Sequence, residues 1–236
     1  IKLDPEYSQA WNNLGEIYEK LGNLKRAKEY LLNATRLDPD NAFAWNNLGL
    51  IYLKEGNLKG AEACFRTALE IDPDYAHAWN NLGNVLFRNK NLDTAERAFK
   101  KAKELDPSWY LPSHNLGRLY TEMGMYDLAE EYLNHALSIS PDNASVLNDL
   151  GYLYEIKGEY EKARELYISA IERNPSLSEA WCNLGTLLSD LGDISEAIKY
   201  LEKALSLNPK LYEAWTTLGS AYGKIGNYSQ AAECLK

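Results

Sequence analysis

Apolar residues in this chain recur at intervals of three and four positions, which is the spacing of one face of an α-helix. Trp45, Leu48 and Tyr52 follow this spacing. A second run with the same spacing ends just before Pro73, where the proline ring blocks the helix from continuing. The pattern predicts two helices joined by a short turn.

The same pattern returns every 34 residues. Proline marks the period at Pro5, Pro39, Pro73, Pro107, Pro141, Pro175 and Pro209. Counted from three residues before the recurring tryptophan, the repeats are 8–41, 42–75, 76–109, 110–143, 144–177 and 178–211, followed by a truncated repeat 7 at 212–236 and preceded by the tail of another repeat at 1–7. A helix pair of this size has too little core to fold alone, so neighbours must stack. The sequence predicts an all-α, right-handed α-solenoid, one array over 1–236 that is a fragment of a longer array.

Glycine stands at two fixed positions of the repeat. At position 8, as at Gly49, it falls in mid-helix, where it costs about 1 kcal/mol relative to alanine, so we expect a partner helix to approach closely there. Position 15 is glycine in six of the seven repeats, which suits a left-handed residue that ends a helix. Lys90 takes that place in repeat 3, and we expect its turn to be strained or shifted by a residue.

The fixed residues of repeat 2 read Trp45, Leu48, Gly49, Tyr52, Ala61, Phe65, Ala68 and Pro73. At a period of 34 residues this motif resembles the tetratricopeptide repeat, and the resemblance covers all 236 residues. It implies that the first helices of the stacked pairs line a concave groove that holds segments of partner proteins. It does not specify one function, because one fold serves many.

The hexapeptide AWNNLG occurs three times, starting at Ala10, Ala44 and Ala78. On a helical wheel its two asparagines, at positions 5 and 6, fall on the side of the first helix opposite its packed face. We call this side the wall. A side-chain amide can both donate to and accept from the main chain of an extended peptide. The expected peptide contacts are Asn13, Asn47, Asn81, Asn115, Asp149 and Asn183 at position 6, with Asn12, Asn46, Asn80 and His114 at position 5.

This asparagine row resembles the one in the tetratricopeptide array attached to O-linked N-acetylglucosamine transferase. Asp149 and Thr217 interrupt the row, so the grip on a peptide should weaken toward the C-terminal end. The alternative is that these asparagines are polar residues on a solvated surface and need no ligand.

The charge of the wall changes along the array. Repeats 1–4 carry several cations, of which Arg88 and Arg118 are further candidate peptide contacts, together with His77. Repeats 5–7 carry Asp149, Glu155, Glu179, Asp190 and Glu213 against Lys224 alone. A partner with a basic stretch over repeats 5–7 would complement this charge. Solvated helix faces in an acidic protein are the alternative interpretation.

Composition limits the partner and the chemistry. A net charge of −9 argues against nucleic acid and anionic membranes as partners, because phosphate contacts need clustered Lys and Arg. No apolar run reaches the roughly 20 residues of a membrane span. The three cysteines lie far apart without a Cys-x-x-Cys motif, which indicates reduced thiols in an intracellular, cytoplasmic protein and no metal site. No cofactor or catalytic motif stands out, so we expect no cofactor and no enzyme in these residues.

Three functional hypotheses follow. The first is a protein-interaction scaffold that binds an extended peptide segment through the position-6 asparagines. The second is the substrate-recruiting array of a larger enzyme, such as a glycosyltransferase, with catalysis outside these residues. The third is self-association through the ends of the array.

Overall fold

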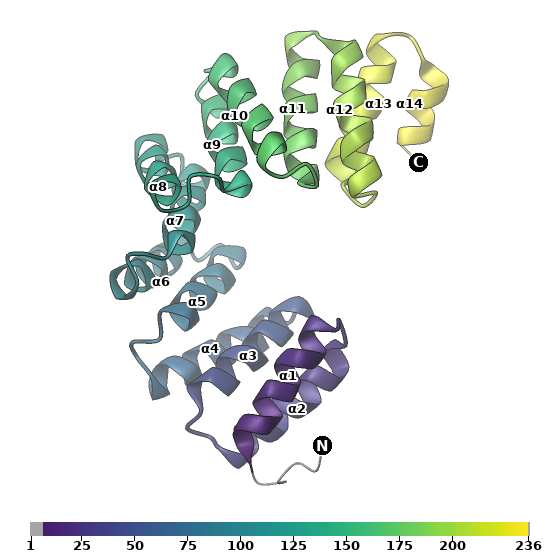
Figure 1. Cartoon of the computed structure of the whole chain (residues 1–236). Helices are drawn as coiled ribbons and strands as arrows, with labels where there is room; N and C mark the ends of the chain where they lie inside the picture. Colours follow the sequence, from purple (N-terminus) through teal and green to yellow (C-terminus); the bar gives the residue numbers. More distant parts are fainter. Residues whose placement is uncertain (1–6, 236) are drawn as a thin grey trace. The chain divides into compact units, whose positions relative to one another are not determined.

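The chain is built of consecutive helical hairpins (Figure 1), and the computed structural model describes residues 7–235. The helices are α1 (Ser8–Lys20), α2 (Leu24–Leu37), α3 (Ala42–Lys54), α4 (Leu58–Ile71), α5 (Ala76–Arg88), α6 (Leu92–Leu105), α7 (Tyr110–Glu122), α8 (Tyr126–Ile139), α9 (Ala144–Ile156), α10 (Tyr160–Arg173), α11 (Ser178–Leu191), α12 (Ile194–Leu207), α13 (Tyr212–Lys224) and α14 (Tyr228–Cys234). Between residues 7 and 235 there is no β-strand. Odd-numbered helices open the repeats and even-numbered helices close them, so the predicted all-α fold of stacked hairpins is confirmed.

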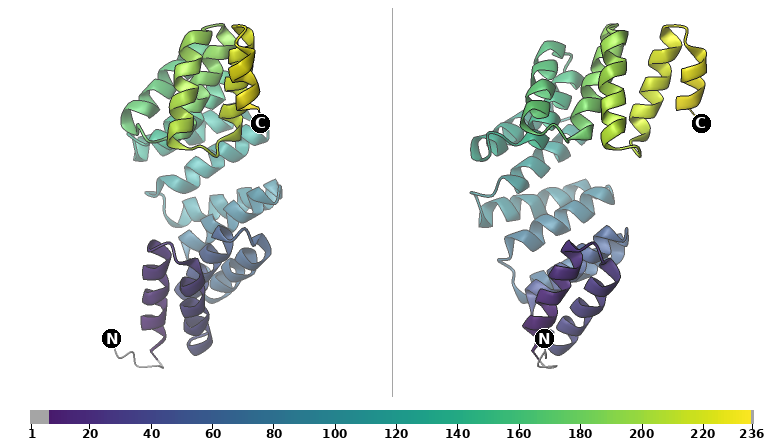
Figure 2. Two further views of the ribbon diagram at one scale, coloured as in Figure 1. Left: turned by 90° about the vertical axis from the view of Figure 1, so that its right-hand side faces the viewer. Right: turned by 45° about the vertical axis from the view of Figure 1, so that its right-hand side comes forward.

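The hairpins form two compact units, Ile1–Leu119 and Tyr120–Lys236, called here the N-terminal unit and the C-terminal unit. Within the N-terminal unit, α3 packs against α2 and α4, and α5 packs against α4 and α6. Within the C-terminal unit, α11 contacts α10 and α12, and α13 contacts α12 and α14. Figure 2 shows the pairs α11–α12 and α13–α14 standing side by side. Each hairpin therefore buries a second face against its neighbour.

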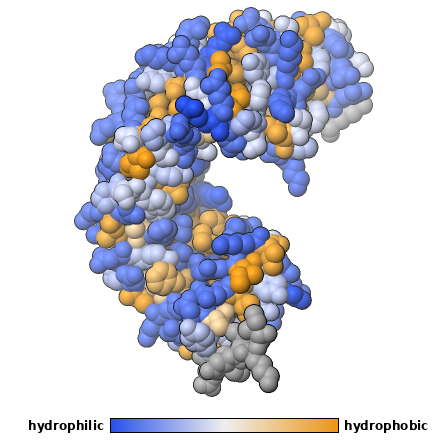
Figure 3. Space-filling model, viewed as in Figure 1, coloured by the Kyte–Doolittle hydropathy of each residue, from blue (hydrophilic) through white to orange (hydrophobic). Residues whose placement is uncertain are grey.

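The buried face of each helix is the one that the apolar spacing predicts. In the N-terminal unit, Leu31, Leu48 and Ile51 are buried in one cluster. In the C-terminal unit, Tyr167 and Leu184 belong to the cluster between α10 and α11. Full burial of such side chains is worth about 1.5–3 kcal/mol each, so stability is spread over the junctions between hairpins. On the face shown in Figure 3, polar residues separate small apolar patches, since the larger apolar faces lie between helices.

The position-8 glycines lie where the two helices of a hairpin come closest. A Cβ on Gly49 would lie 2.6 Å from a ring carbon of Phe65, and one on Gly83 would lie 2.6 Å from a ring carbon of Phe99. Any larger residue would force the ring or the helix to move. The close approach predicted from the sequence is confirmed.

The turn between the two helices is left-handed in every full repeat. Lys90 has φ 59°, which is the region that its glycine counterparts adopt. The glycines with positive φ are Gly22, Gly56, Gly124, Gly158, Gly192 and Gly226. Around Lys90, α5 ends and α6 begins at the same repeat positions as α3 and α4. The turn of repeat 3 is therefore strained and not shifted, at a cost of about 1 kcal/mol or more for a residue that carries a side chain.

A hydrogen bond joins the recurring tryptophan to the recurring proline. The indole nitrogen of Trp45 donates to the carbonyl oxygen of Pro39 at 2.8 Å, and Trp79 does the same to Pro73 at 2.8 Å. The pairs Trp181–Pro175 and Trp215–Pro209 repeat this bond at 2.9 Å. In these four repeats the bond fixes the start of the first helix to the end of the preceding repeat.

Candidate functional site

The two adjacent asparagines of AWNNLG form hydrogen bonds between neighbouring repeats. Nδ2 of the position-6 side chain donates to Oδ1 of the position-5 asparagine of the preceding repeat, an interaction that we call the asparagine clip. The clips are Asn47 to Asn12 at 3.0 Å, Asn81 to Asn46 at 2.9 Å, Asn115 to Asn80 at 2.8 Å and Asn183 to Asn148 at 3.0 Å. Each clip ties one first helix to the next.

Position 5 lies inside the stack and not on the wall, which differs from the expectation. Asn12 is 2% exposed, and Asn46 and Asn80 are each 3% exposed. His114 at the same position is 7% exposed. For the three asparagines the physical reason is the clip, which needs the position-5 oxygen between two first helices, where an unpaired polar group would be costly. These four side chains have little surface to offer a peptide.

Position 6 remains partly exposed at Asn47, Asn81 and Asn183. In each of them the clip uses Nδ2, and Oδ1 accepts no hydrogen bond from any residue of the described range 7–235. The wall therefore presents a row of hydrogen-bond acceptors, where the sequence suggested amides free both to donate and to accept.

The other position-6 residues predicted from the sequence are placed differently. Asn115 is 7% exposed, so its amide is largely covered. Asn13 is exposed, but its Oδ1 accepts a hydrogen bond from Gln9 Nε2 at 2.9 Å. Asp149 accepts from Asn148 Nδ2 at 3.3 Å. The open part of the row is thus Asn47, Asn81 and Asn183.

Charged groups on the wall of the N-terminal unit are paired across repeats. Lys54 Nζ lies 2.6 Å from Glu19 Oε1. At the first clip, Asn47 Nδ2 also donates to Glu16 Oε1 at 2.7 Å. The predicted contact Arg118 has its guanidinium carbon 5.9 Å from the centre of the Phe87 ring. Arg88, the other predicted cation, is exposed in the last turn of α5.

His77 is exposed at position 2 and belongs to a row of rings. Its imidazole stacks on Trp109 with 4.3 Å between ring centres and lies 5.9 Å from Tyr75. Tyr75 in turn lies 4.9 Å from Phe43. His77 is therefore an aromatic surface residue whose ring is held by its neighbours.

Carboxylates gather on the wall of the C-terminal unit. Burial is the main cause that raises the pKa of Glu155 in α9 above its ordinary value. The Tyr167 hydroxyl donates to Glu155 Oε2 at 2.6 Å and acts in the opposite direction. The negative charges of Asp190 in α11 and Glu213 in α13 raise the pKa further. The charges of α11 and α13 thus act on the carboxylate of α9.

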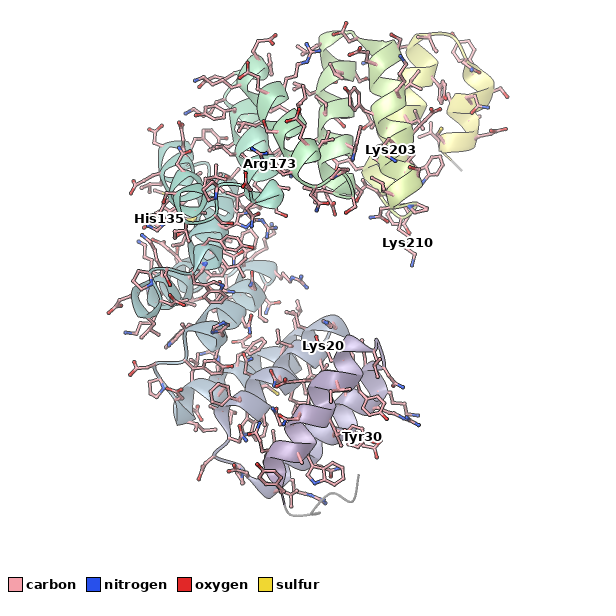
Figure 4. All side chains as sticks on the ribbon, viewed as in Figure 1. Lys20, Tyr30, His135, Arg173, Lys203 and Lys210 are labelled. Carbon is pink, nitrogen blue, oxygen red and sulfur yellow. The ribbon has the colours of Figure 1, made fainter. Side chains whose placement is uncertain are left out.

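Several cations of the C-terminal unit lie on second helices or their turns, away from these carboxylates. Figure 4 labels Arg173 at the end of α10, Lys203 on α12 and Lys210 in the turn that follows α12. Arg173 Nε contacts Asp142 Oδ1 at 2.9 Å. The positive charges of these residues lie on second helices or turns, so they do not offset the negative charge of the wall.

The described thiols and carboxylates lack the arrangements that hold metal ions. Burial raises the pKa of the Cys64 and Cys182 thiols to about 11, so both are protonated at neutral pH. Within residues 7–235, no three His, Cys, Asp or Glu side chains are grouped so that they could hold a metal ion. None of the described helices is long and apolar enough to cross a membrane.

Comparison with protein families gives one result along nearly the whole chain. Models described as tetratricopeptide repeat match residues 8–41, 42–75, 74–142, 109–176, 178–211 and 200–233. No curated protein sequence matches the chain.

Solved structures share the fold. A chain of the Cut9–Hcn1 hetero-tetramer of APC/C is 19% identical, with a TM-score of 0.83 over 92% of this chain and 43% of that chain, so this chain spans less than half of it. PilW, described as a widely conserved type IV pilus biogenesis factor, is 25% identical, with a TM-score of 0.79 over 89% of this chain and 98% of that one. YrrB, described as a TPR protein with an unusual peptide-binding site, is 22% identical, with a TM-score of 0.54 over 78% and 95%.

Proposed function

Because this chain belongs to the tetratricopeptide repeat family, we propose that it is a protein-interaction scaffold that holds an extended segment of a partner along the wall of its first helices. Repeats of this family are generally scaffolds without catalytic activity. The partner's main chain would donate its amide N–H groups to the open position-6 oxygens.

The observation that carries this proposal is the row of open acceptors held by the clips. In Asn47, Asn81 and Asn183, Nδ2 is bonded to the preceding repeat, so the amide cannot rotate freely and Oδ1 is held on the wall. A group that is already fixed loses little conformational freedom when a ligand binds. The clip thus prepares the acceptor for a peptide.

The spacing of repeats suits an extended chain. Consecutive first helices contact one another, as α3 does with α1 and α5. Packed helices lie about 8–10 Å apart, and an extended peptide advances about 3.3 Å per residue. The open acceptors of the adjacent repeats 2 and 3, Asn47 and Asn81, would therefore meet amides of the partner that lie roughly three residues apart.

Charge favours a basic stretch of the partner over the C-terminal unit. Burial raises the pKa of Glu155 there, and the negative charges of Asp190 and Glu213 raise it further. Bringing cations to like charges that already repel relieves that repulsion and also speeds association. We therefore place the basic part of the partner over repeats 5–7.

YrrB, which has this fold, is described as having an unusual peptide-binding site. That description belongs to YrrB, and it supports the proposal only by showing that the fold can carry such a site. The alternative proposal, in which these repeats recruit substrates for a larger enzyme such as a glycosyltransferase, uses the same wall and places catalysis outside residues 1–236. The cytoplasmic location and self-association through the array ends stay predictions.

The test separates the acceptor from the clip by comparing two triple variants. One replaces Asn47, Asn81 and Asn183 with alanine, which removes both the clips and the acceptors. Its matched control replaces Asn12, Asn46 and Asn148 with alanine, which breaks the same three clips and leaves the acceptor oxygens in place.

Both variants are measured with a fluorescent peptide selected against residues 1–236 from a random library. Loss of three hydrogen bonds at about 0.5–1.5 kcal/mol each predicts a Kd weakened by roughly 10-fold to 1,000-fold in the first variant. The control should bind within about tenfold of the parent, because only the positioning of the acceptor is lost. Equal weakening in both folded variants would contradict a direct role for the position-6 oxygens.

A further inference from the structure

The last turn of the first helix carries a cation in four repeats. At position 13 these cations are Lys20, Lys54, Arg88 and Lys224. Repeats 4, 5 and 6 have Glu122, Ile156 and Asp190 at the same position. A cation is favourable there because the last carbonyl groups of a helix carry partial negative charge. Repeats 5 and 6 lack this feature, and neither α9 nor α11 has a basic residue in its last turn.

Two of these cations, Lys54 and Lys224, contact groups of the preceding repeat. Lys54 Nζ lies 2.6 Å from Glu19 Oε1. Lys224 Nζ donates to the carbonyl oxygen of Ser189 at 2.9 Å and to its hydroxyl oxygen at 3.2 Å. In both pairs the lysine is 35 residues after its partner, so position 13 of one repeat reaches position 12 of the preceding repeat.

Glu155 and Asp190 occupy this same pair of positions in repeats 5 and 6. They are also 35 residues apart, but here a carboxylate stands where Lys54 and Lys224 have an ammonium group. Among the described residues, no cation forms a salt bridge with either of them. Two negative groups thus face each other at the ends of two helices whose dipoles also favour a cation.

A pocket of about 400 Å³ lies at this junction and is lined by both carboxylates. Tyr152, Ile156 and Tyr160 line it from α9 and α10, and Leu191 lines it from α11. Tyr152 is 48% exposed and Tyr160 is 47% exposed, so their rings are open to a ligand. The volume lies at the small end of the roughly 300–1,000 Å³ range of ligand pockets.

We propose that this pocket binds one arginine side chain of the partner segment, with the guanidinium group at Glu155 and Asp190 in the place that Lys54 and Lys224 take at their own junctions. The inference rests on the proposed scaffold function, since the arginine belongs to the peptide held along the same wall. Binding would then depend on one side chain of the partner as well as on the main-chain hydrogen bonds to the position-6 asparagines.

Arginine fits this lining better than lysine does. Its planar guanidinium group can face two carboxylates at once and can stack on tyrosine rings, whereas an ammonium group is a compact charge. The aliphatic stem of the side chain can pack against Ile156 and Leu191 while its charged end reaches the carboxylates.

The first experiment titrates ¹⁵N-labelled protein of residues 1–236 with acetyl-Gly-Gly-Arg-Gly-Gly-amide and with the same peptide carrying lysine or citrulline. Citrulline keeps the shape of arginine and removes its charge. We expect amide shifts in residues 152–160 and 187–191, with arginine binding at least about tenfold more tightly than citrulline and more tightly than lysine. Equal binding of citrulline, or shifts spread over acidic surfaces outside these segments, overturns the proposal.

In the second experiment a lysine of the protein itself takes the place of the partner's arginine in the pocket. Asp190→Lys places an ammonium group in the register of Lys54, where it should pair with Glu155. We expect binding of the arginine peptide to weaken by about tenfold or more and Tm to rise. Glu172→Lys is the matched control, because it makes the same charge change on an exposed residue of α10 outside the pocket. It should leave binding within about twofold, since distant surface charges are screened.

If Asp190→Lys does not fold, Glu155→Gln tests the same contact, and it too should weaken binding of the arginine peptide while binding of the citrulline peptide stays unchanged. The two proposals fail separately. A library peptide that binds Asp190→Lys and the parent equally well overturns the arginine pocket and leaves the scaffold in place. Failure of all library peptides to bind, with the arginine peptide still held by the pocket, overturns the scaffold.

Discussion

The N-terminal and C-terminal units use the same repeat positions for different electrostatic purposes. At positions 12 and 13 the N-terminal unit has the ion pair Glu19–Lys54, whereas the C-terminal unit has Glu155 and Asp190. The clips and the glycine contacts are present in both units, as in Asn81–Asn46 and Asn183–Asn148. The packing of the repeat is therefore the same in both units. A change of one side chain at position 13, from lysine to aspartate, replaces the ion pair with two carboxylates that have no cation between them.

The largest expected effect tests whether the hairpins of the two units are equivalent. Gly83→Ala would place a Cβ 2.6 Å from the Phe99 ring, and Gly151→Ala would place one 2.8 Å from the Tyr167 ring. Overpacking of this kind costs about 1–3 kcal/mol, and we expect both variants near the upper end. Chemical denaturation should give similar losses for the two.

The matched control for this pair is Gly223→Ala, because nothing lies within 4 Å of the Cβ that it adds. Alanine is the better helix former, so this variant should gain up to about 1 kcal/mol. A large difference between Gly83→Ala and Gly151→Ala would mean that the units differ in their cores as well as on their walls.

The second prediction concerns the clip. Asn46→Ala removes a buried side chain and leaves the partly buried Asn81 Nδ2 without its partner, which should cost about 1–3 kcal/mol. Cys182 occupies the same position in repeat 6, and Thr217 stands where its clip donor would be. Cys182→Ala should therefore cost only the lost apolar contact, about 1 kcal/mol. Urea unfolding of both variants checks the contrast, and equal losses would count against the clip as the cause.

The third and smallest effect should have opposite signs in the two units. Glu19→Gln removes the salt bridge to Lys54, and an exposed pair of this kind is worth about 0–1 kcal/mol, so Tm should fall slightly. Glu155→Gln removes a charge that burial, Asp190 and Glu213 disfavour, so Tm at pH 7 should rise.

The direction with pH follows from the raised pKa of Glu155. The folded protein holds this proton more tightly than the unfolded chain does, so the carboxyl contributes stability at low pH and loses that contribution as pH rises through its folded pKa. The gain from Glu155→Gln should therefore be present at neutral pH and disappear near pH 4, at about the unperturbed pKa of glutamate. Differential scanning calorimetry at the two pH values measures this. A gain that is unchanged at low pH would rule out the charge as its cause.

Most of the fold could be predicted from the sequence, because period, helix spacing and turn glycines all record local geometry. The close packing at Gly49 and the left-handed turns were expected on these grounds and are confirmed. The wall was predicted less well. A helical wheel treats each helix alone, so it placed Asn46 on the wall, although Asn46 lies between two first helices.

The clip could have been recognised from the sequence, but not from a helical wheel of one helix, because it joins residues of two neighbouring repeats. Each clip spans 35 residues, one more than the period, which pairs position 6 with position 5 of the preceding repeat. Reading two stacked repeats together would have found the pairing of Asn81 with Asn46. The pocket of the C-terminal unit needed the structure, because Tyr160 belongs to a second helix and joins the lining only through the turn.

The constant separation of 35 residues has a consequence for how the chain gains and loses order. Clips and position-13 contacts never join parts of the sequence that are far apart, so each can form as soon as two neighbouring hairpins exist. Folding then has no long loop to close, and disorder that starts in a hairpin joined to its neighbour by a clip has to break that clip before it spreads. Repeats 6 and 7 have no asparagine pair at this register, only Cys182 and Thr217. Repeats 4 and 5 also lack such a pair, with His114 and Asp149 at these positions. At the C-terminal end, helix α13 is therefore where unravelling meets no resistance from an asparagine pair.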